Sequence, residues 1–458
     1  MKKKVLTVLA LVPLVLGTIG YLFSGERITS AIYAAVALYF TSPISDAYNA
    51  YIEIARWTAP LVTATAILRA LQNVWESLRN RVALFGKKNS VSVYSDMDSR
   101  IRFGKDVSAI YPGDKLKKYA HEHIIMFSTD EMNLQFYEKH KKELAGKKVY
   151  IGVRDIECCF LNPLEDVTVF DINGAIARML WKEISLWNKE KNEFNIVVWG
   201  SNTLSGEINC TGLQMNLFSN KQKMKYCFVT DNSNFLIRHS ELNLMNGDEL
   251  SYLDYKNPEI WDAVSNADMI IVSDVVDVET MQTLVVKAGE SKIYYYSPVE
   301  GDAISHLSFG NVVAFGRNET VLTDENIRCG ALIRKAKKLN EHYAKLYGSE
   351  KDWNALSGFL KGSNISASDF GEVLSMLNER IGEEEQAELE HIRWCRYMFL
   401  NYYTLGTPAN EKNRDDDKRI HKNLIDFSEL DPKERVKDVE AIRTVSYTHL
   451  RAHETGRN

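Results

Sequence analysis

The sequence lacks the short motifs that would assign a function directly. Its six cysteines include no C-x-x-C pair, so we expect neither a tetrahedral metal site nor a redox pair. It also lacks an excess of positive charge, because 56 Lys and Arg residues face 61 Asp and Glu residues, which argues against nucleic acid as a partner. The 458 residues, 45% of them hydrophobic, are enough for several domains with proper cores.

Residues 1–84 are predicted to form a transmembrane hairpin. Lys2, Lys3 and Lys4 precede an uncharged run, Val5 to Phe23, that is about long enough to cross a bilayer. A second helix, Trp57 to Trp75, has a tryptophan at each end and basic residues after it. The positive-inside rule then places the soluble domains in the cytoplasm, at the inner membrane. A cleaved signal peptide and a buried helix are the respective alternatives.

The stretch between these spans, residues 28–40, is too short to cross a bilayer and suits a re-entrant or an interfacial helix. The order of span, short helix and span is similar to the pore unit of a two-span potassium channel. Such channels need a T-V-G-Y-G filter, and residues 40–48, FTSPISDAY, contain no glycine. A conducting pore and an anchoring hairpin are both open at this point.

From about residue 89 the sequence alternates short apolar runs with amphipathic stretches, which indicates an α/β fold with doubly wound parallel sheets. Two Rossmann-like modules are predicted, at 89–190 and 191–320. The second has a glycine-containing turn after its first strand, which is where a pyrophosphate would bind. The residues proposed to bind NAD or another nucleotide are Gly200, Ser201, Asn202, Gly206 and Asp231.

The corresponding turn of the first module, residues 94–100, reads YSDMDSR and is predicted not to bind phosphate, because it has acids and no glycine. Around the turn of the second module we find no nucleophile, base and orienting group that form a recognisable catalytic motif. The protein is therefore predicted not to be an enzyme, and an NAD-dependent oxidoreductase ranks last among the functions considered.

Residues 321–380 are predicted to form a helical linker and residues 381–444 a separate α-helical domain. The helix near 383–400 has one apolar stripe that includes Leu389 and Cys395 and a second that contains His391 and Trp394. A helix that is apolar on two sides is buried between partners, so core packing is the structural alternative for His391 and Trp394.

The segment 387–438 resembles the RyR domain, the module named after its repeats in ryanodine receptors. Lys422 and Tyr402 depart from the family pattern, which has proline and tryptophan there. The residues that match the pattern are Ala387, His391, Trp394, Tyr403, Gly406, His421, Leu424, Leu430, Glu434 and Asp438. The resemblance implies a ligand site, with His391, Trp394, Tyr403, Gly406 and His421 as candidate residues.

The order of the parts is similar to that of bacterial proteins that join a membrane hairpin, RCK/TrkA-type Rossmann domains and a RyR domain. The resemblance implies a membrane-anchored homo-oligomer that senses a nucleotide-like small molecule and regulates potassium or other cation transport. A non-conducting, membrane-tethered sensor or assembly module is the alternative.

The last residues, 445–458, resemble a translated sequencing adapter, because VSYTHLRAHET corresponds codon by codon to a transposon-end adapter. The RyR domain is therefore expected to be truncated after Thr444. The alternative is a basic tail in which His449 and His453, four residues apart, bind a metal ion.

Overall fold

The computed structural model describes most of the chain and divides it into two compact units, Met1–Lys87 and Lys88–Asn458. Each unit is described by itself below. The described residues are 2–84, 90–96, 107–111, 116–117, 120–157, 167–231, 234–306, 309–328, 330–409 and 412–455.

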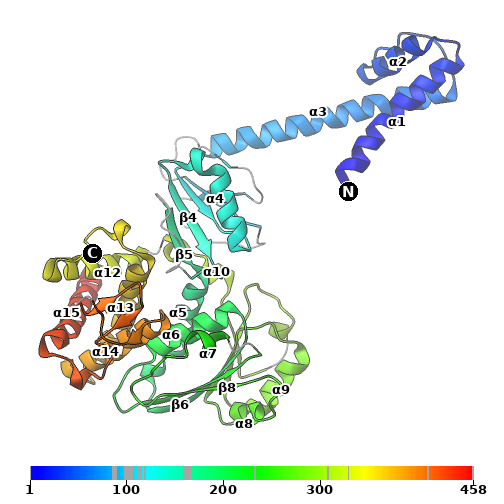
Figure 1. The fold of residues 1–458 in the computed structure, drawn as a ribbon. Helices are drawn as coiled ribbons and strands as arrows, with labels where there is room; N and C mark the ends of the chain where they lie inside the picture. The colour runs from blue at the N-terminus through cyan, green and yellow to red at the C-terminus, as the bar shows by residue number, and fades with distance from the viewer. Residues whose placement is uncertain are drawn as a thin grey trace. The chain divides into compact units, whose positions relative to one another are not determined.

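The first unit is a helical hairpin with a short helix packed against it. Helices α1 (Lys2–Phe23) and α3 (Ala50–Leu84) run side by side, and α2 (Ile28–Ala37) continues into a 3-10 turn (Leu38–Phe40) (Figure 1). Small residues let the helices approach closely. A Cβ atom on Gly17 would lie 3.1 Å from the Ala35 Cβ atom.

The predicted membrane spans find no support in this unit. In the described part of the chain, no helix is both long enough and apolar enough to cross a membrane. Helix α3 carries Glu53, Arg56 and Arg69 among its apolar residues.

The second unit begins with a five-stranded sheet in the order β2-β1-β3-β4-β5, and all neighbouring strands are parallel. Helix α4 (Asp130–Leu144) connects β3 to β4, and the Thr129 side chain caps it by accepting a hydrogen bond from the Met132 amide. Helix α5 (Ile172–Ile184) leads to the second sheet. The strands are β1 (Val91–Tyr94), β2 (Val107–Tyr111), β3 (Glu122–Ile125), β4 (Lys148–Val153) and β5 (Val167–Asp171).

The second sheet has six parallel strands in the order β11-β10-β9-β6-β7-β8. This is the strand order of the dinucleotide-binding Rossmann fold, and the order reverses between β6 and β9. The predicted α/β class with parallel Rossmann-like sheets is confirmed. The strands are β6 (Glu193–Trp199), β7 (Lys223–Val229), β8 (Glu249–Leu253), β9 (Met269–Val272), β10 (Lys292–Tyr296) and β11 (Val312–Phe315).

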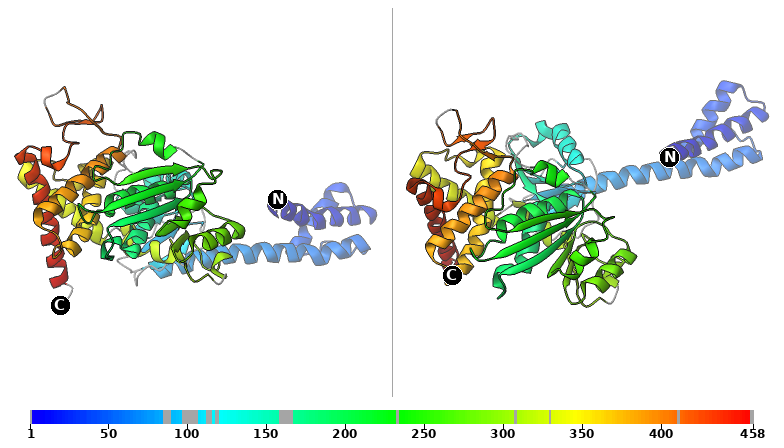
Figure 2. Two further views of the ribbon diagram at one scale, coloured as in Figure 1. Left: turned by 90° about the horizontal axis from the view of Figure 1, so that it is seen from below. Right: turned by 60° about the horizontal axis from the view of Figure 1, so that its bottom comes forward.

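Both faces of this sheet are covered, as the alternation of side chains along β6 shows. Ile196 and Val198 belong to the main core with α5 and α6 (Thr203–Met215), whereas Val197 and Trp199 join a core on the opposite face. That opposite face is covered by α8 (Ile260–Ser265) and α9 (Val278–Ala288) (Figure 2).

Helices α12 to α15 pack together beside α6, whereas α10 contacts α5 (Figures 1 and 2). A three-stranded sheet in the order β12-β14-β13 follows α14. The helices are α7 (Asn234–Arg238), α10 (Asn318–Val321), α11 (Asp324–Arg328), α12 (Gly330–Tyr347), α13 (Gly358–Leu377), α14 (Glu383–Leu400) and α15 (Pro432–Thr455), and the strands are β12 (Thr404–Leu405), β13 (Arg414–Asp415) and β14 (Ile420–His421).

One buried ion pair joins α14 to the second sheet. The Arg396 guanidinium lies 2.8 Å from an Asp248 carboxylate oxygen, and both side chains are fully inaccessible to solvent. Arg396 also donates hydrogen bonds to the carbonyl oxygens of Leu213 and Leu244, at 2.7 Å each. The helical part and the second sheet therefore share a polar contact that tolerates little displacement.

The predictions about the cysteines and about the last residues of the chain concern segments that the structure describes only in part. Cys210, Cys227 and Cys395 are free thiols, and the other three cysteines lie outside the described residues. Among the described residues no group of three His, Cys, Asp or Glu side chains could hold a metal ion.

Helix α15 runs on to Thr455, so the adapter-like segment begins inside it. The origin of that segment stays a prediction.

Candidate ligand-binding sites

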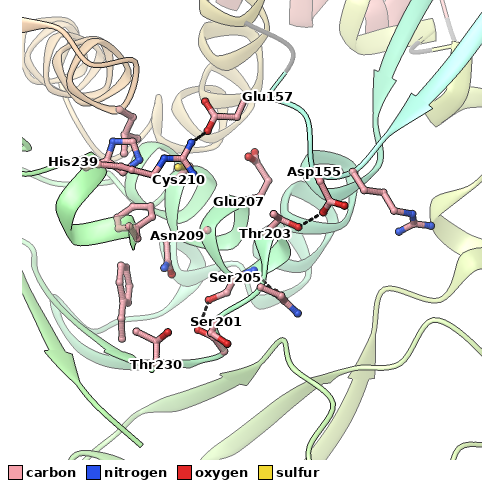
Figure 3. A pocket seen from close by; sticks show the side chains of 18 of the residues that line it. Asp155, Glu157, Ser201, Thr203, Ser205, Glu207, Asn209, Cys210, Thr230 and His239 are labelled. Carbon is pink, nitrogen blue, oxygen red and sulfur yellow. Dashed lines mark hydrogen bonds and ion pairs between the residues drawn. The ribbon is translucent and has the colours of Figure 1, made fainter. Parts of the chain in front are cut away.

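The first candidate site, here called the strand-end cavity, has a volume of about 340 Å³. It lies where β4, β5, β6 and β7 end, which is the edge at which α/β sheets bind ligands. Helices α6, α7 and α14 supply the other walls. Both Rossmann-like modules and the helical part thus contribute to it, and Figure 3 shows Asp155, Glu157 and Glu207 on one side of it.

Four of the predicted nucleotide-binding residues line this cavity: Gly200, Ser201, Asn202 and Gly206. The amides of Gly200, Ser201 and Gly206, and that of the neighbouring Ser205, are already engaged, however. The Ser201 amide donates a hydrogen bond to the Asp274 carboxylate at 2.8 Å, and the Ser205 amide donates to the Asn202 side chain at 2.8 Å. A pyrophosphate would have to displace both acceptors, one of which carries a negative charge.

Gly200 lies close to the strand beside it, and its predicted contact with phosphate stays a prediction. A Cβ atom at this position would collide with the hydroxyl group of Ser273, at the end of β9. The Asn202 side chain also donates a hydrogen bond to the Ser273 carbonyl oxygen at 2.9 Å. Asp231, the predicted ribose acceptor, is exposed and does not line the cavity. At the point where the strand order reverses, the residues that follow β6 therefore contact those that follow β9.

The strand-end cavity is acidic. Asp155, Glu157, Asp171 and Glu207 line it, against Arg154 and Arg238. Burial, together with the neighbouring Asp171 carboxylate, raises the pKa of Glu207 to about 8. Glu207 is therefore protonated at neutral pH and can donate a hydrogen bond. Arg238 forms an ion pair with Glu157, so its charge is already balanced.

The second candidate site, here called the helical cavity, has a volume of about 1160 Å³. Helices α12, α13 and α14, the start of α15 and the loop around β13 surround it. Three of the candidates from the RyR resemblance, His391, Trp394 and His421, line it. The ring of Trp394 lies 5.6 Å from that of His391 and 4.8 Å from that of His421.

His391 holds the walls of this cavity together. Its Nδ1 lies 3.2 Å from an Asp438 carboxylate oxygen on α15, and its Nε2 lies 2.8 Å from the Ile425 carbonyl oxygen. Burial is the largest single effect and lowers the pKa of His391, but Asp438 and Cys395, through their hydrogen bonds and charges, together outweigh it and raise the pKa to about 10. Both ring nitrogens then donate, and neither is left to contact a ligand.

Trp394 and His421, unlike His391, keep groups that can contact a ligand. Trp394 is only partly buried, so part of its side chain is accessible from the cavity. Burial, followed by the positive charge of Arg414, lowers the pKa of His421 to about 4. The Nδ1 of His421 accepts a hydrogen bond from the Asn423 amide at 3.0 Å, so the ring proton is on Nε2.

Tyr403 and Gly406, the other two candidates from the resemblance, do not line the helical cavity. Tyr403 is buried, stacks on Phe359 at 5.2 Å and donates a hydrogen bond to Asp416. A Cβ atom on Gly406 would lie 2.8 Å from the Ile420 side chain. Both residues therefore support the loop that forms one wall.

Sequence reasoning missed Asn209, His239 and Tyr252, which all line the strand-end cavity. Nothing around them matches a motif. They come from α6, the segment after α7, and β8, and β8 has no continuous apolar run. Only the folded chain brings them together.

The comparisons with known proteins leave the family open. No protein-family profile and no curated protein matches the chain. Among solved structures, the malic enzyme of Entamoeba histolytica aligns over 83% of this chain and 86% of its own, with 10% identity and a TM-score of 0.28. The prediction that the protein is not an enzyme runs against this finding and is withdrawn. A likeness at this TM-score carries no argument about the reaction.

Proposed function

We propose that the protein is a ligand sensor that binds a nucleotide-like small molecule in the helical cavity. The observation that carries the proposal is that Trp394 and His421, both expected from the RyR resemblance, line this cavity side by side, in edge-to-face contact at a ring distance of 4.8 Å. Aromatic side chains are common platforms for nucleobases, and stacking contributes about 1–3 kcal/mol per base.

The charges around the helical cavity suggest which nucleotides bind. Arg414 pairs with Asp416 at 2.7 Å, and Lys437 pairs with Glu434 at 2.7 Å. Carboxylates outnumber cations among the lining residues. We therefore expect NAD or a cyclic mononucleotide, which carry less negative charge than ATP, to bind more tightly than ATP.

Isothermal titration of the full chain with NAD, cyclic AMP and ATP tests this proposal. Trp394→Ala is expected to weaken binding by about 1–3 kcal/mol, or roughly five- to 150-fold, because the stacking surface is lost. Tyr347→Ala, at the rim of the same cavity, is expected to have a smaller effect. Binding of none of the three nucleotides, or equal affinity in Trp394→Ala, would contradict the proposal.

We propose in addition that the first unit attaches the protein to a membrane and that the sensor regulates cation transport. The support is a large set of exposed apolar side chains on this unit, combined with tight contacts between small residues, as is common among helices in lipid. Examples are Phe23, Ile28, Phe40, Trp57, Leu61 and Trp75.

Flotation of the full chain with lipid vesicles tests the attachment, and potassium flux into those vesicles tests the regulation. Flux that changes with the bound nucleotide supports a channel-like regulator. Flotation without any flux supports the non-conducting sensor instead. Recovery of the protein in the unbound fraction, with each of the three nucleotides and without any, would refute membrane attachment.

A further inference from the structure

The strand-end cavity contains three buried polar atoms without hydrogen-bond partners among the described residues. They are the Oδ1 of Asn209, the Nδ1 of His239 and the hydroxyl of Tyr252. Asn209 is only 4% exposed, and all three residues line the cavity. Buried polar groups in native proteins are normally paired, so three unpaired groups around one cavity indicate a ligand.

The three groups have complementary hydrogen-bonding abilities. The Asn209 oxygen can only accept a hydrogen bond, whereas the Tyr252 hydroxyl can donate or accept one. Burial, followed by the charge of Arg238, lowers the pKa of His239 to about 4, so its ring is neutral and its Nδ1 suits either role. The protonated Glu207 carboxyl adds a donor. A ligand with several donors and acceptors can satisfy these groups together.

Aromatic rings form part of the wall. Phe228 lies 5.4 Å from Phe235 and 5.3 Å from Tyr252, in both cases with the rings nearly perpendicular. The Phe235 ring lies 4.6 Å from the ring of His239. All four residues line the cavity, so a flat heterocycle would find ring faces or edges beside the polar groups.

The same cavity is unsuitable for phosphate. At its glycine-containing turn the Ser201 and Ser205 amides already donate to Asp274 and Asn202, and acids outnumber arginines in its lining. Its volume of about 340 Å³ is also at the lower end of the range of ~300–1,000 Å³ typical of ligand pockets. Both observations disfavour a dinucleotide.

We propose that the strand-end cavity binds a phosphate-free nucleoside or nucleobase, with its heterocycle hydrogen-bonded to Asn209 and Tyr252. An asparagine side chain pairs well with the amino group and ring nitrogen of adenine, which makes adenosine and adenine the first probes. The site contacts both Rossmann-like modules and α14, so its occupant would tie together the parts that meet there. The proposal does not depend on a ligand in the helical cavity.

Titration calorimetry on the full chain with adenosine, adenine, guanosine, cytidine, uridine and AMP tests this site. Tyr252→Phe removes only a hydroxyl without a partner, so we expect unchanged folding and about tenfold weaker binding. Asn209→Leu is expected to abolish binding and to leave the melting temperature of the ligand-free protein unchanged or higher. Asn266→Leu, at the exposed end of α8, is the matched control and should bind like the unaltered protein.

Several outcomes would overturn the proposal. One is that no nucleoside or nucleobase binds, and another is that AMP binds more tightly than adenosine. A third is that binding persists in both Tyr252→Phe and Asn209→Leu and is lost in Trp394→Ala, which would place the ligand in the helical cavity. Loss in the first two variants with retention in Trp394→Ala supports the strand-end cavity even if the proposed nucleotide sensor fails.

Discussion

Glutamine in place of His391 should remove a pH dependence of stability that the fold creates. In the folded protein the imidazolium lies between the Asp438 carboxylate and the Ile425 carbonyl oxygen, and its pKa is raised to about 10 from an ordinary value of 6.5. The two pKa values differ by about 3.5, and each pKa unit corresponds to about 1.36 kcal/mol. The charged His391 therefore contributes at most about 5 kcal/mol to the free energy of unfolding.

The sign follows from proton binding. The folded protein holds the His391 proton more tightly than the unfolded chain, so the stabilisation is complete below pH 6.5 and declines as the pH rises toward 10. Between pH 6.5 and 8.5 the unaltered protein should lose about 2.3 kcal/mol of unfolding free energy from this residue, because the unfolded histidine is still half protonated at pH 6.5. His391→Gln should lack that loss, because glutamine does not titrate.

Urea unfolding followed by tryptophan fluorescence at pH 6.5, 7.5 and 8.5 measures the effect. Trp394 is a suitable local reporter, because its ring lies 5.6 Å from that of His391. His306→Gln, at an exposed position, is the matched control and should keep the pH dependence of the unaltered protein. Identical pH dependence in the unaltered protein and His391→Gln would refute the assignment of a charged His391.

Two further substitutions test the packing around the cavities. Arg396→Leu leaves the buried Asp248 carboxylate without its cation and should cost about 3–5 kcal/mol of unfolding free energy. The double variant with Asp248→Leu should recover much of that loss. If urea unfolding shows no such recovery, the buried ion pair is contradicted. Gly200→Ala should cost about 1–3 kcal/mol because its methyl group meets the Ser273 hydroxyl, and Ser273→Ala should relieve part of the cost; equal melting temperatures of Gly200→Ala and the unaltered protein would exclude this role.

The strands show how far local sequence can predict this fold. Runs such as residues 148–153 and 193–199 are apolar and rich in β-branched residues, which gives a strand signal independent of the rest of the chain. The alternation with amphipathic helices then implies parallel strands, because parallel neighbours need a crossover connection. Strand β8 gives no such signal, since it lies at a sheet edge and only some of its side chains are covered.

The candidate sites were predictable only in part, because local sequence does not show which residues far apart in the chain contact each other. The resemblance between residues 387–438 and the RyR pattern pointed to Trp394 and His421, which do share a cavity. Pattern matching could not tell that His391 uses both ring nitrogens within the protein. Nor could it tell that the amides at the glycine turn are bonded to Asp274, which lies 73 residues from Ser201 in the sequence.

The sequence by itself therefore determined the α/β class, the parallel sheets and the position of most strands, because these depend on hydrophobic periodicity within short segments. Only the tertiary structure decided which polar atoms are paired. Asn209, His239 and Tyr252 are candidate ligand contacts because they line one cavity and each has a buried polar atom without a partner among the described residues. Pairing depends on contacts between residues far apart in the chain, and no local pattern records those contacts.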